Sequence, residues 1–343
     1  MRLLPRPRTP AALGAWLRLA LLLWGAVGMG CGWPVPLPPA GELPPTREGR
    51  VALYERTLRA YLQRGRIPLI QVGTSLGGWR DAAALTAGMD RAGVALAAVT
   101  APDEAALWEA VRQHPDRLVP LTAEAAGDAW WKGGAAFPAS LERQLGRGAA
   151  ALGPLLVGGL SLPGEEGQRR REALGALFRL AGEKRAPLIL DMPPEDGDVG
   201  QLERLAAAHP AVQAVWTGAG HLPRQEMNPG YGHALLRALS LRHANLAFGL
   251  TTLPPPEPSP VIRPRRNLLY DPGGRFSPEW QALLDARVDH FLTGSSAGEN
   301  SADYARRLQA YRRLVLDALT PASRERVAYQ NAWRLLTGRE WRE

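Results

Sequence analysis

The chain has 343 residues, 45% of them hydrophobic, which supplies a sizeable core for one large domain or two small ones. The formal charge is +8, and removing the four arginines of residues 1–30 leaves +4 for the rest of the chain. No tight basic run interleaved with aromatic side chains accompanies this mild excess, so the composition argues against a nucleic-acid-binding protein.

The first thirty residues have the layout of an export signal. Three arginines fall among the first eight residues, and residues 19–30 form an apolar stretch without a charge. Gly28 and Gly30 then supply small residues just before Cys31. The apolar stretch is shorter than the about 20 residues that a membrane-spanning helix needs. We therefore predict a signal peptide over residues 1–30.

Cys31 is the only cysteine, so it can form no internal disulfide. Residues 28–31 resemble the lipobox of bacterial lipoproteins, apart from Gly28, where a leucine is usual. This resemblance implies lipid attachment at Cys31 and an anchor on the periplasmic side of the cell envelope. Gly32 is not the aspartate often linked to inner-membrane retention, which favours the outer membrane. The alternative is an uncleaved anchor helix in which Cys31 has no role.

The segment after the cysteine is rich in proline. Six prolines fall between residues 33 and 46, a density that prevents a helix and favours extended polyproline geometry. We interpret residues 31–50 as a tether between the membrane and a body that spans residues 51–343.

The body alternates short apolar runs with helical patterns. Eight runs predict strands, at residues 67–72, 94–100, 117–122, 149–157, 187–190, 212–217, 245–251 and 288–293. Helical patterns separate them, and one more follows at residues 321–336. This alternation favours parallel βαβ units, and eight of them predict a (β/α)8 TIM barrel with an extra C-terminal helix. An open doubly wound sheet is the alternative.

Five segments resemble one family in order and spacing. Residues 66–71, 209–220, 245–248, 289–296 and 329–336 resemble the first, sixth, seventh and eighth strands and the closing helix of amidohydrolase-related proteins. These are metal-dependent hydrolases and decarboxylases on a (β/α)8 barrel. The resemblance spans residues 51–338, and it implies a barrel whose site lies at the carboxyl ends of the strands.

The family's metal ligands are missing from the matching positions. The resemblance places them at Gln71, Gly73 and Ser75 in strand one, Asp191 in strand five, Gly218 in strand six and Ser296 after strand eight. No histidine precedes residue 114, so shifting the alignment cannot restore the first group. A single aspartate cannot hold a catalytic ion. We therefore expect no metal and no other cofactor, although the family implies a divalent metal.

A few side chains after the predicted strands are candidates for a site. Asp191 and Glu124 are carboxylates that could act as acid and base, and His221 follows strand six. The alternative for each is an ordinary loop residue. Hydroxyl groups at the same end of the barrel are candidates for ligand binding: Thr74, Ser75, Thr217 and Ser296.

Three functional hypotheses follow. The first is a non-catalytic protein that binds a small molecule or a protein partner at the barrel mouth. The second is a diverged hydrolase that acts on C–O or C–N bonds with a site rebuilt around Asp191. The third, a conventional metal hydrolase hidden by misalignment, is disfavoured by the missing histidines.

Overall fold

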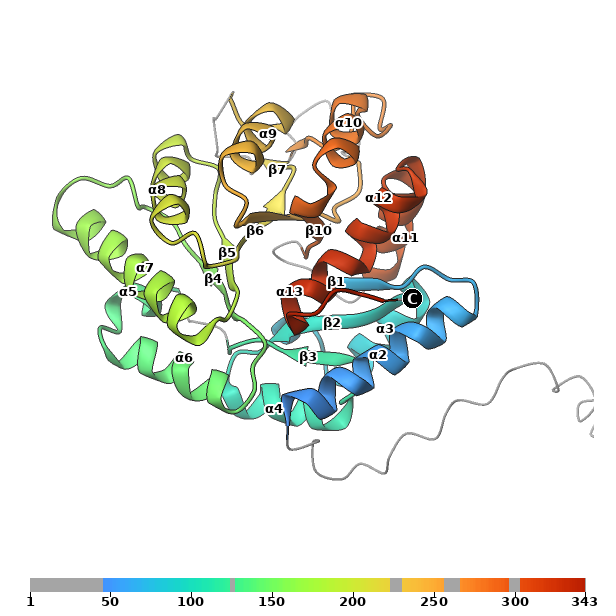
Figure 1. The fold of residues 1–343 in the computed structure, drawn as a ribbon, viewed down its shortest axis with the longest axis horizontal. Helices are drawn as coiled ribbons and strands as arrows, with labels where there is room; N and C mark the ends of the chain where they lie inside the picture. Colours follow the sequence, from blue (N-terminus) through green and yellow to red (C-terminus); the bar gives the residue numbers. More distant parts are fainter. Residues whose placement is uncertain (1–45, 124–126, 223–229, 256–265, 296–302, 343) are drawn as a thin grey trace, which may run out of the picture. The chain divides into compact units, whose positions relative to one another are not determined.

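The structure is a computed structural model that describes residues 46–123, 127–222, 230–255, 266–295 and 303–342. Within it, eight parallel strands alternate with helices that lie outside them (Figure 1). The strands are β1 (Leu69–Ser75), β2 (Val94–Thr100), β3 (Leu118–Pro120), β4 (Leu152–Leu156), β5 (Leu188–Asp191), β6 (Ala214–Ala219), β8 (Leu246–Leu250) and β10 (Phe291–Thr293). Each of them falls on one of the eight predicted runs.

The strands form two sheets, in the orders β1-β2-β3 and β10-β8-β6-β5-β4, which join at two seams. Between β3 and β4, the Ala150 amide donates to the Pro120 carbonyl over 2.7 Å, and the Thr122 amide donates to the Ala151 carbonyl over 3.2 Å. Between β1 and β10, Val72 forms a parallel bridge with Gly294. These contacts close the ring, which confirms the predicted (β/α)8 barrel over the open sheet.

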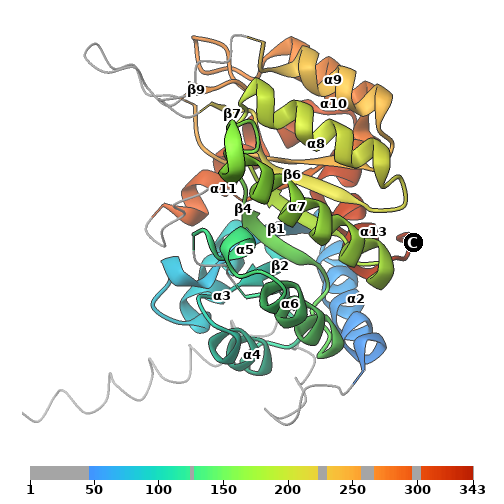
Figure 2. The same cartoon turned by 90° about the vertical axis from the view of Figure 1, so that its left-hand side faces the viewer.

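Helices connect the strands and cover the outside of the ring (Figure 2). They are α3 (Ala82–Ala92), α4 (Glu104–Gln113), α5 (Ala129–Lys132), α6 (Ala136–Gly146), α7 (Gly164–Lys184), α8 (Asp196–Ala208), α9 (His233–Arg242), α10 (Pro278–Ala286) and α11 (Tyr304–Leu314). Short polar side chains begin several of them. Asp81 accepts the Ala84 amide over 2.7 Å at α3, and Asp103 accepts the Ala106 amide over 2.8 Å at α4. These N-caps satisfy amides that the first helical turn leaves without partners.

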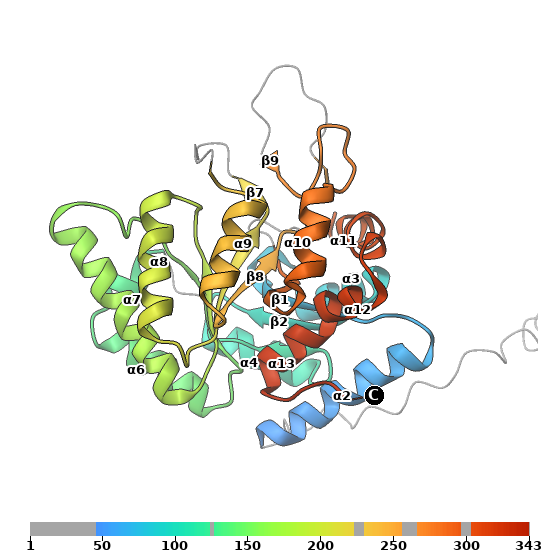
Figure 3. The same cartoon turned by 45° about the horizontal axis from the view of Figure 1, so that its top comes forward.

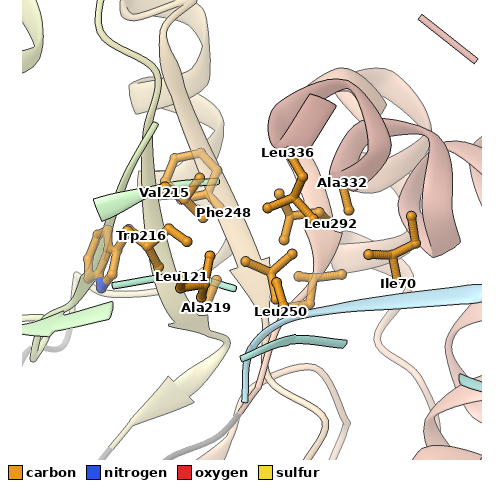
Figure 4. Packing of buried hydrophobic residues seen from close by; sticks show 14 of the residues in the cluster. Ile70, Leu121, Val215, Trp216, Ala219, Phe248, Leu250, Leu292, Ala332 and Leu336 are labelled. Carbon is orange, nitrogen blue, oxygen red and sulfur yellow. The ribbon is translucent and has the colours of Figure 1, made fainter. Parts of the chain in front are cut away.

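The core lies on both sides of the strands. Every residue of β2 is buried, as expected for a parallel strand covered on both faces. Trp216, Phe248 and Phe291 occupy neighbouring positions on β6, β8 and β10, and their rings form a row of aromatic contacts. Figure 4 shows Leu292 beside Ala332 and Leu336 of the C-terminal helix, so the same core continues to the end of the chain.

Elements from both ends of the chain lie at the amino ends of the strands. Helix α2 (Arg47–Gln63) places the Tyr54 hydroxyl 3.2 Å from the Leu118 carbonyl at the start of β3. The C-terminal segment forms α12 (Pro321–Glu325) and α13 (Asn331–Thr337), which confirms the predicted extra helix. Helix α2 begins inside the segment that the sequence assigns to the tether. Cys31 and the predicted signal peptide lie outside the described residues.

Two buried asparagines tie the amino ends of the strands together. The Asn245 side-chain amide donates to three carbonyls at the end of α8 and the start of β6, over 3.0–3.1 Å. The Asn331 side-chain amide donates to the Val288 and Phe291 carbonyls over 2.8 and 2.7 Å. Both asparagines belong to segments that carry the family resemblance, and here their role is structural.

A short antiparallel ribbon at the carboxyl end was not predicted. It pairs β7 (His221–Leu222) with β9 (Arg266–Asn267). Figure 3 shows this ribbon at the end of the barrel opposite to α2 and α13. Among the described residues, every helix is too short or too polar to cross a lipid bilayer.

Candidate functional site at the barrel mouth

The interior of the barrel is filled at its carboxyl end by four residues from different strands. A Cβ atom on Gly73 of β1 would lie 3.3 Å from Ser295 Oγ, 3.8 Å from Thr217 Cγ2 and 3.9 Å from Pro154 Cγ. Ser295 Oγ also donates to the Gly73 carbonyl over 2.5 Å. We call Gly73, Pro154, Thr217 and Ser295 the mouth floor. It includes Gly73, one of the strand-one positions at which the family resemblance predicts a ligand.

Glycines allow the backbones to approach closely beside the mouth floor. A Cβ atom on Gly294 would lie only 2.8 Å from the Gly249 carbonyl carbon, and one on Gly249 would lie 3.5 Å from Thr217 Cα. Larger residues at these positions would force β8 and β10 apart. The floor is therefore closed by main chain and small side chains, which offer hydroxyl and carbonyl groups but no charged donor.

Above the floor, a carboxyl group lies beside an exposed apolar side chain. Leu156, Asp191 and Thr217 are register partners on adjacent strands β4, β5 and β6, so their side chains point to the same face. Leu156 is 59% exposed, although it ends a barrel strand. Because the Thr217 methyl faces the Gly73 position across the barrel, this face is the interior one. Leu156 and Asp191 therefore line an open mouth.

Asp191 is the group with the most distinctive electrostatics in the mouth. Its side chain is half-buried and accepts no hydrogen bond from the described residues. Burial raises the pKa of the Asp191 carboxyl above its ordinary value, and no neighbouring charge opposes this shift. A desolvated carboxyl without a partner is a candidate for ligand binding or proton transfer.

The loops that flank Asp191 are held by hydrogen bonds to their backbone. The fully buried Asp198 of α8 accepts the Ser161 amide over 2.8 Å, which links the loop after β4 to the helix after β5. Arg170 of α7 donates to the Gly158 carbonyl over 2.7 Å in the same loop. Trp216 Nε1 donates to the Met192 carbonyl over 2.7 Å and anchors the residue that follows Asp191. The walls of the mouth are thus fixed by buried groups.

The predicted hydroxyl candidates have different surroundings. Thr217 lies next to Asp191, and its hydroxyl donates to the Leu190 carbonyl over 3.2 Å. Thr74 is fully buried, and it pairs with the equally buried Val99 of β2 after an irregularity at Gly73. Its hydroxyl is therefore shielded from a ligand in the mouth. The Ser75 hydroxyl accepts the Gly77 amide over 3.1 Å and caps the short turn Leu76–Gly78.

His221 is the remaining candidate that the structure describes, and it belongs to a different sheet from Asp191. It lies in β7, where it pairs with Asn267 of β9. Glu124 and Ser296 lie outside the described residues. Of all the candidates, Asp191 and Thr217 are the two that the structure places side by side.

The described residues do not fit the metal that the family resemblance implies. Within the described ranges, no group of three or more His, Cys, Asp or Glu side chains is placed to hold a metal ion. At the strand-one level, Gly73 leaves no room for a histidine, because Ser295 and Pro154 fill the space beside it. The described residues of the mouth floor, Gly73, Pro154, Thr217 and Ser295, are neutral. We therefore derive no metal-dependent step from this site.

Three residues of the site, Leu156, Pro154 and Ser295, were missed by sequence reasoning. A leucine at a strand end looks like a core residue, and only its 59% exposure distinguishes it. Ser295 is adjacent to the predicted Ser296, and a shift of one residue in the strand-eight alignment would have found it. The sequence around Pro154 gives no sign that it belongs to the site, because Gly73, which lies beside it in space, is distant along the chain.

The mouth floor can be tested with two glycines that share a left-handed backbone. Gly73 has φ +92° and Gly218 has φ +77°, but a Cβ atom on Gly218 would meet nothing within 4 Å. An alanine at either position lowers the free energy of unfolding by about 1–2 kcal/mol, because its side chain disfavours the left-handed backbone. We expect Gly73→Ala to lower the free energy of unfolding by at least about 1 kcal/mol more than Gly218→Ala, because the new methyl group also displaces Ser295. Urea unfolding measures both, and equal losses would show that the floor is not tightly packed.

The raised pKa of Asp191 predicts a pH-dependent stability. Above the ordinary value of 3.8, the unfolded chain releases this proton while the folded chain retains it. The stability of the parent protein therefore falls as pH rises from 3.8 toward the raised folded value, and it stays lower above that value. Asp191→Asn should be more stable than the parent at neutral pH, and the difference should vanish at acidic pH. Denaturant unfolding across pH checks this. Glu195→Gln, at an exposed carboxyl, should show no such trend.

Comparison with solved structures places the barrel among known folds. A TatD homolog from Escherichia coli matches with a TM-score of 0.50 and 14% identity over 78% of this chain and 97% of that chain. A 2,6-dihydroxybenzoate decarboxylase matches with a TM-score of 0.45 and 13% identity over 78% and 99% of the two chains. A mutant organophosphorus hydrolase from Deinococcus radiodurans matches with a TM-score of 0.42 and 15% identity over 85% and 86%.

No family model and no curated protein matches the sequence. At such low identity, the structural likeness concerns the fold alone. The chain is an α/β protein with an amidohydrolase-related TIM-barrel fold.

Proposed function

We propose that this protein is a membrane-tethered barrel that binds a small ligand at its mouth without metal-dependent catalysis. One observation carries this proposal: the unpartnered Asp191 carboxyl lies beside the exposed Leu156 above a closed, neutral floor. A pocket that combines an apolar wall with a single well-placed polar group is typical of ligand-binding sites.

The chemistry of the mouth indicates the class of ligand. Asp191 requires a hydrogen-bond donor, because burial without a partner is unfavourable for a carboxyl in either protonation state. Leu156 gains from contact with an apolar group. A ligand with an amine, amide or hydroxyl donor next to a short apolar part satisfies both residues. The Thr217 hydroxyl already donates to the Leu190 carbonyl, so Thr217 contributes to the shape of the floor and not to hydrogen bonding with the ligand.

A thermal-shift panel of small primary amines, amides and alcohols with short apolar chains tests this proposal. A compound that binds the folded state should raise the midpoint in proportion to its affinity. Asp191→Asn and Leu156→Ser should each weaken the best compound about tenfold or more. Glu195→Gln is the matched control, because it removes an exposed carboxyl from the neighbouring loop. Equal effects of Asp191→Asn and Glu195→Gln would contradict the mouth as the binding site.

A second candidate function is a diverged hydrolase that acts on C–O or C–N bonds. The raised pKa of Asp191 favours it, because a general acid must hold its proton near the working pH. The same panel can include chromogenic esters, lactones and anilides with metal-depleted protein. Turnover that disappears in Asp191→Asn and persists in Glu195→Gln would support this candidate. Stoichiometric zinc, manganese or iron in the native protein would contradict both candidates.

The proposal also includes export of the protein and lipid attachment at Cys31. They are supported by the charged start, the short apolar stretch and the lipobox-like residues 28–31. Mass spectrometry of the mature N-terminus should show that residues 1–30 are absent and that Cys31 is acylated. An intact N-terminus, or an unmodified Cys31 on a soluble protein, would remove the anchor and leave only the barrel.

A further inference from the structure

The two ends of the barrel carry opposite charge in the helices that surround it. Helices that follow parallel strands run antiparallel to them, so their first turns lie at the mouth and their last turns at the amino end. Acidic residues occupy first turns: Glu104, Glu165, Glu166, Asp196, Asp198 and Glu279. Basic residues occupy last turns: Arg91, Arg112, Arg143, Lys184, Arg242, Arg312 and Arg313. This arrangement stabilises each helix dipole, and it places basic side chains at the amino end. Arg112, Lys184 and Arg242 form ion pairs there, so the arginines open to a partner must be found among the others.

A groove of about 410 Å³ collects part of this charge at the start of β1. It lies between the end of α2, the end of α3 and α11, and four arginines line it: Arg66, Arg91, Arg312 and Arg324. We call it the amino-end arginine groove. Its two carboxylates already have cationic partners. Asp90 binds Arg117 over 2.8 Å, and Asp317 binds Arg324 over 3.5 Å.

Three of the four arginines, Arg66, Arg91 and Arg312, form no ion pair with a carboxylate in the described residues. Arg66 and Arg91 are exposed. Arg312 donates to the Ile67 carbonyl over 2.8 Å and to the Gly93 carbonyl over 3.1 Å. Burial lowers the pKa of Arg312 below its ordinary value, and the charge of Asp317 opposes this shift without cancelling it. A phosphate in the groove would give these guanidinium groups an anionic partner.

A second groove, of about 870 Å³, opens at the amino ends of β5, β6 and β8, and its lining includes Arg47, Arg185, Arg334 and Asp289. Arg334 pairs with Glu340 over 3.4 Å. Arg185 has φ +50°, a left-handed conformation in which glycine is ordinarily found. It is exposed and forms no ion pair with any residue that the structure describes. Exposed arginines in two grooves at one end match a surface that presents many phosphates better than they match one small anion.

We propose that the amino-end arginine groove binds the phosphate groups of anionic phospholipids, so that the barrel docks on a membrane by its amino end. This inference rests on the proposed membrane attachment, since the anchor would bring that surface within reach. Guanidinium groups form paired hydrogen bonds with phosphate oxygens. The acidic first turns and Asp191 then face away from the lipid, which leaves the mouth open to its ligand.

Vesicle flotation of residues 31–343 carrying Cys31→Ser, which lack both the predicted signal peptide and any lipid anchor, tests the proposal. The probes are vesicles of phosphatidylglycerol with phosphatidylcholine, and vesicles of phosphatidylcholine alone. We expect binding to the anionic vesicles only, weakening as salt rises. The double variant Arg66→Gln, Arg91→Gln should bind about tenfold or more weakly, because each arginine near an anionic surface adds to the attraction.

Matched variants separate specific docking from net charge. Arg80→Gln, Arg169→Gln removes the same charge from exposed side chains at the mouth end and should leave binding unchanged. Arg66→Lys, Arg91→Lys keeps the charge and should retain most of the binding. Equal losses in the two glutamine variants would overturn the proposal. So would binding of inorganic phosphate, measured by calorimetry, without binding to vesicles. Ligand binding through Asp191 is measured independently, so failure here is distinct from failure of the mouth.

Discussion

The seam between β1 and β10 is the constraint on which the rest of the structure depends. At this seam the first and last strands meet through the bridge of Val72 with Gly294, and Ser295 donates to the Gly73 carbonyl. Without it, the strands would form one open sheet, joined only at the seam between β3 and β4. The seam brings glycines and a short hydroxyl side chain together at the top of the barrel, where Ser295, Thr217 and Pro154 fill the space beside Gly73. Closure of the fold and the neutral character of the mouth floor therefore have one physical cause.

The family resemblance predicts the fold because the segments on which it rests contain residues that hold the barrel together. Asn245 and Asn331 bind backbone carbonyls at the amino ends of the strands, and His209 ends α8. These roles are the same whatever reaction a barrel performs. The mouth lies at the opposite end, where Gly73 and Asp191 stand at positions for which the family resemblance predicts ligands. A fold shared at 14% identity therefore says little about activity.

The two ends of the barrel offer different groups for binding. The mouth offers one desolvated carboxyl, an exposed leucine and neutral main chain, which suits a small ligand with one donor. The amino end offers arginines that accumulate at the last turns of helices and exceed the available carboxylates in the amino-end arginine groove. The second feature follows from the parallel arrangement, because the helices that connect the strands present the negative ends of their dipoles to the amino face, where basic side chains are favourable. Binding at the mouth and docking at the amino end can therefore coexist.

The sequence by itself determined the order of eight strands, the helices between them and the barrel that they form. Its prediction at residues 94–100 coincides with β2, and its predicted helix at residues 321–336 covers α12 and most of α13. Local periodicity and short capping residues suffice for this, because they act within a few residues of the chain. Only the tertiary structure decided that Thr74 is buried, that Leu156 is exposed and that β7 pairs with β9. Those outcomes depend on neighbours from distant strands, such as Ser295 beside Gly73, and no local pattern encodes such contacts.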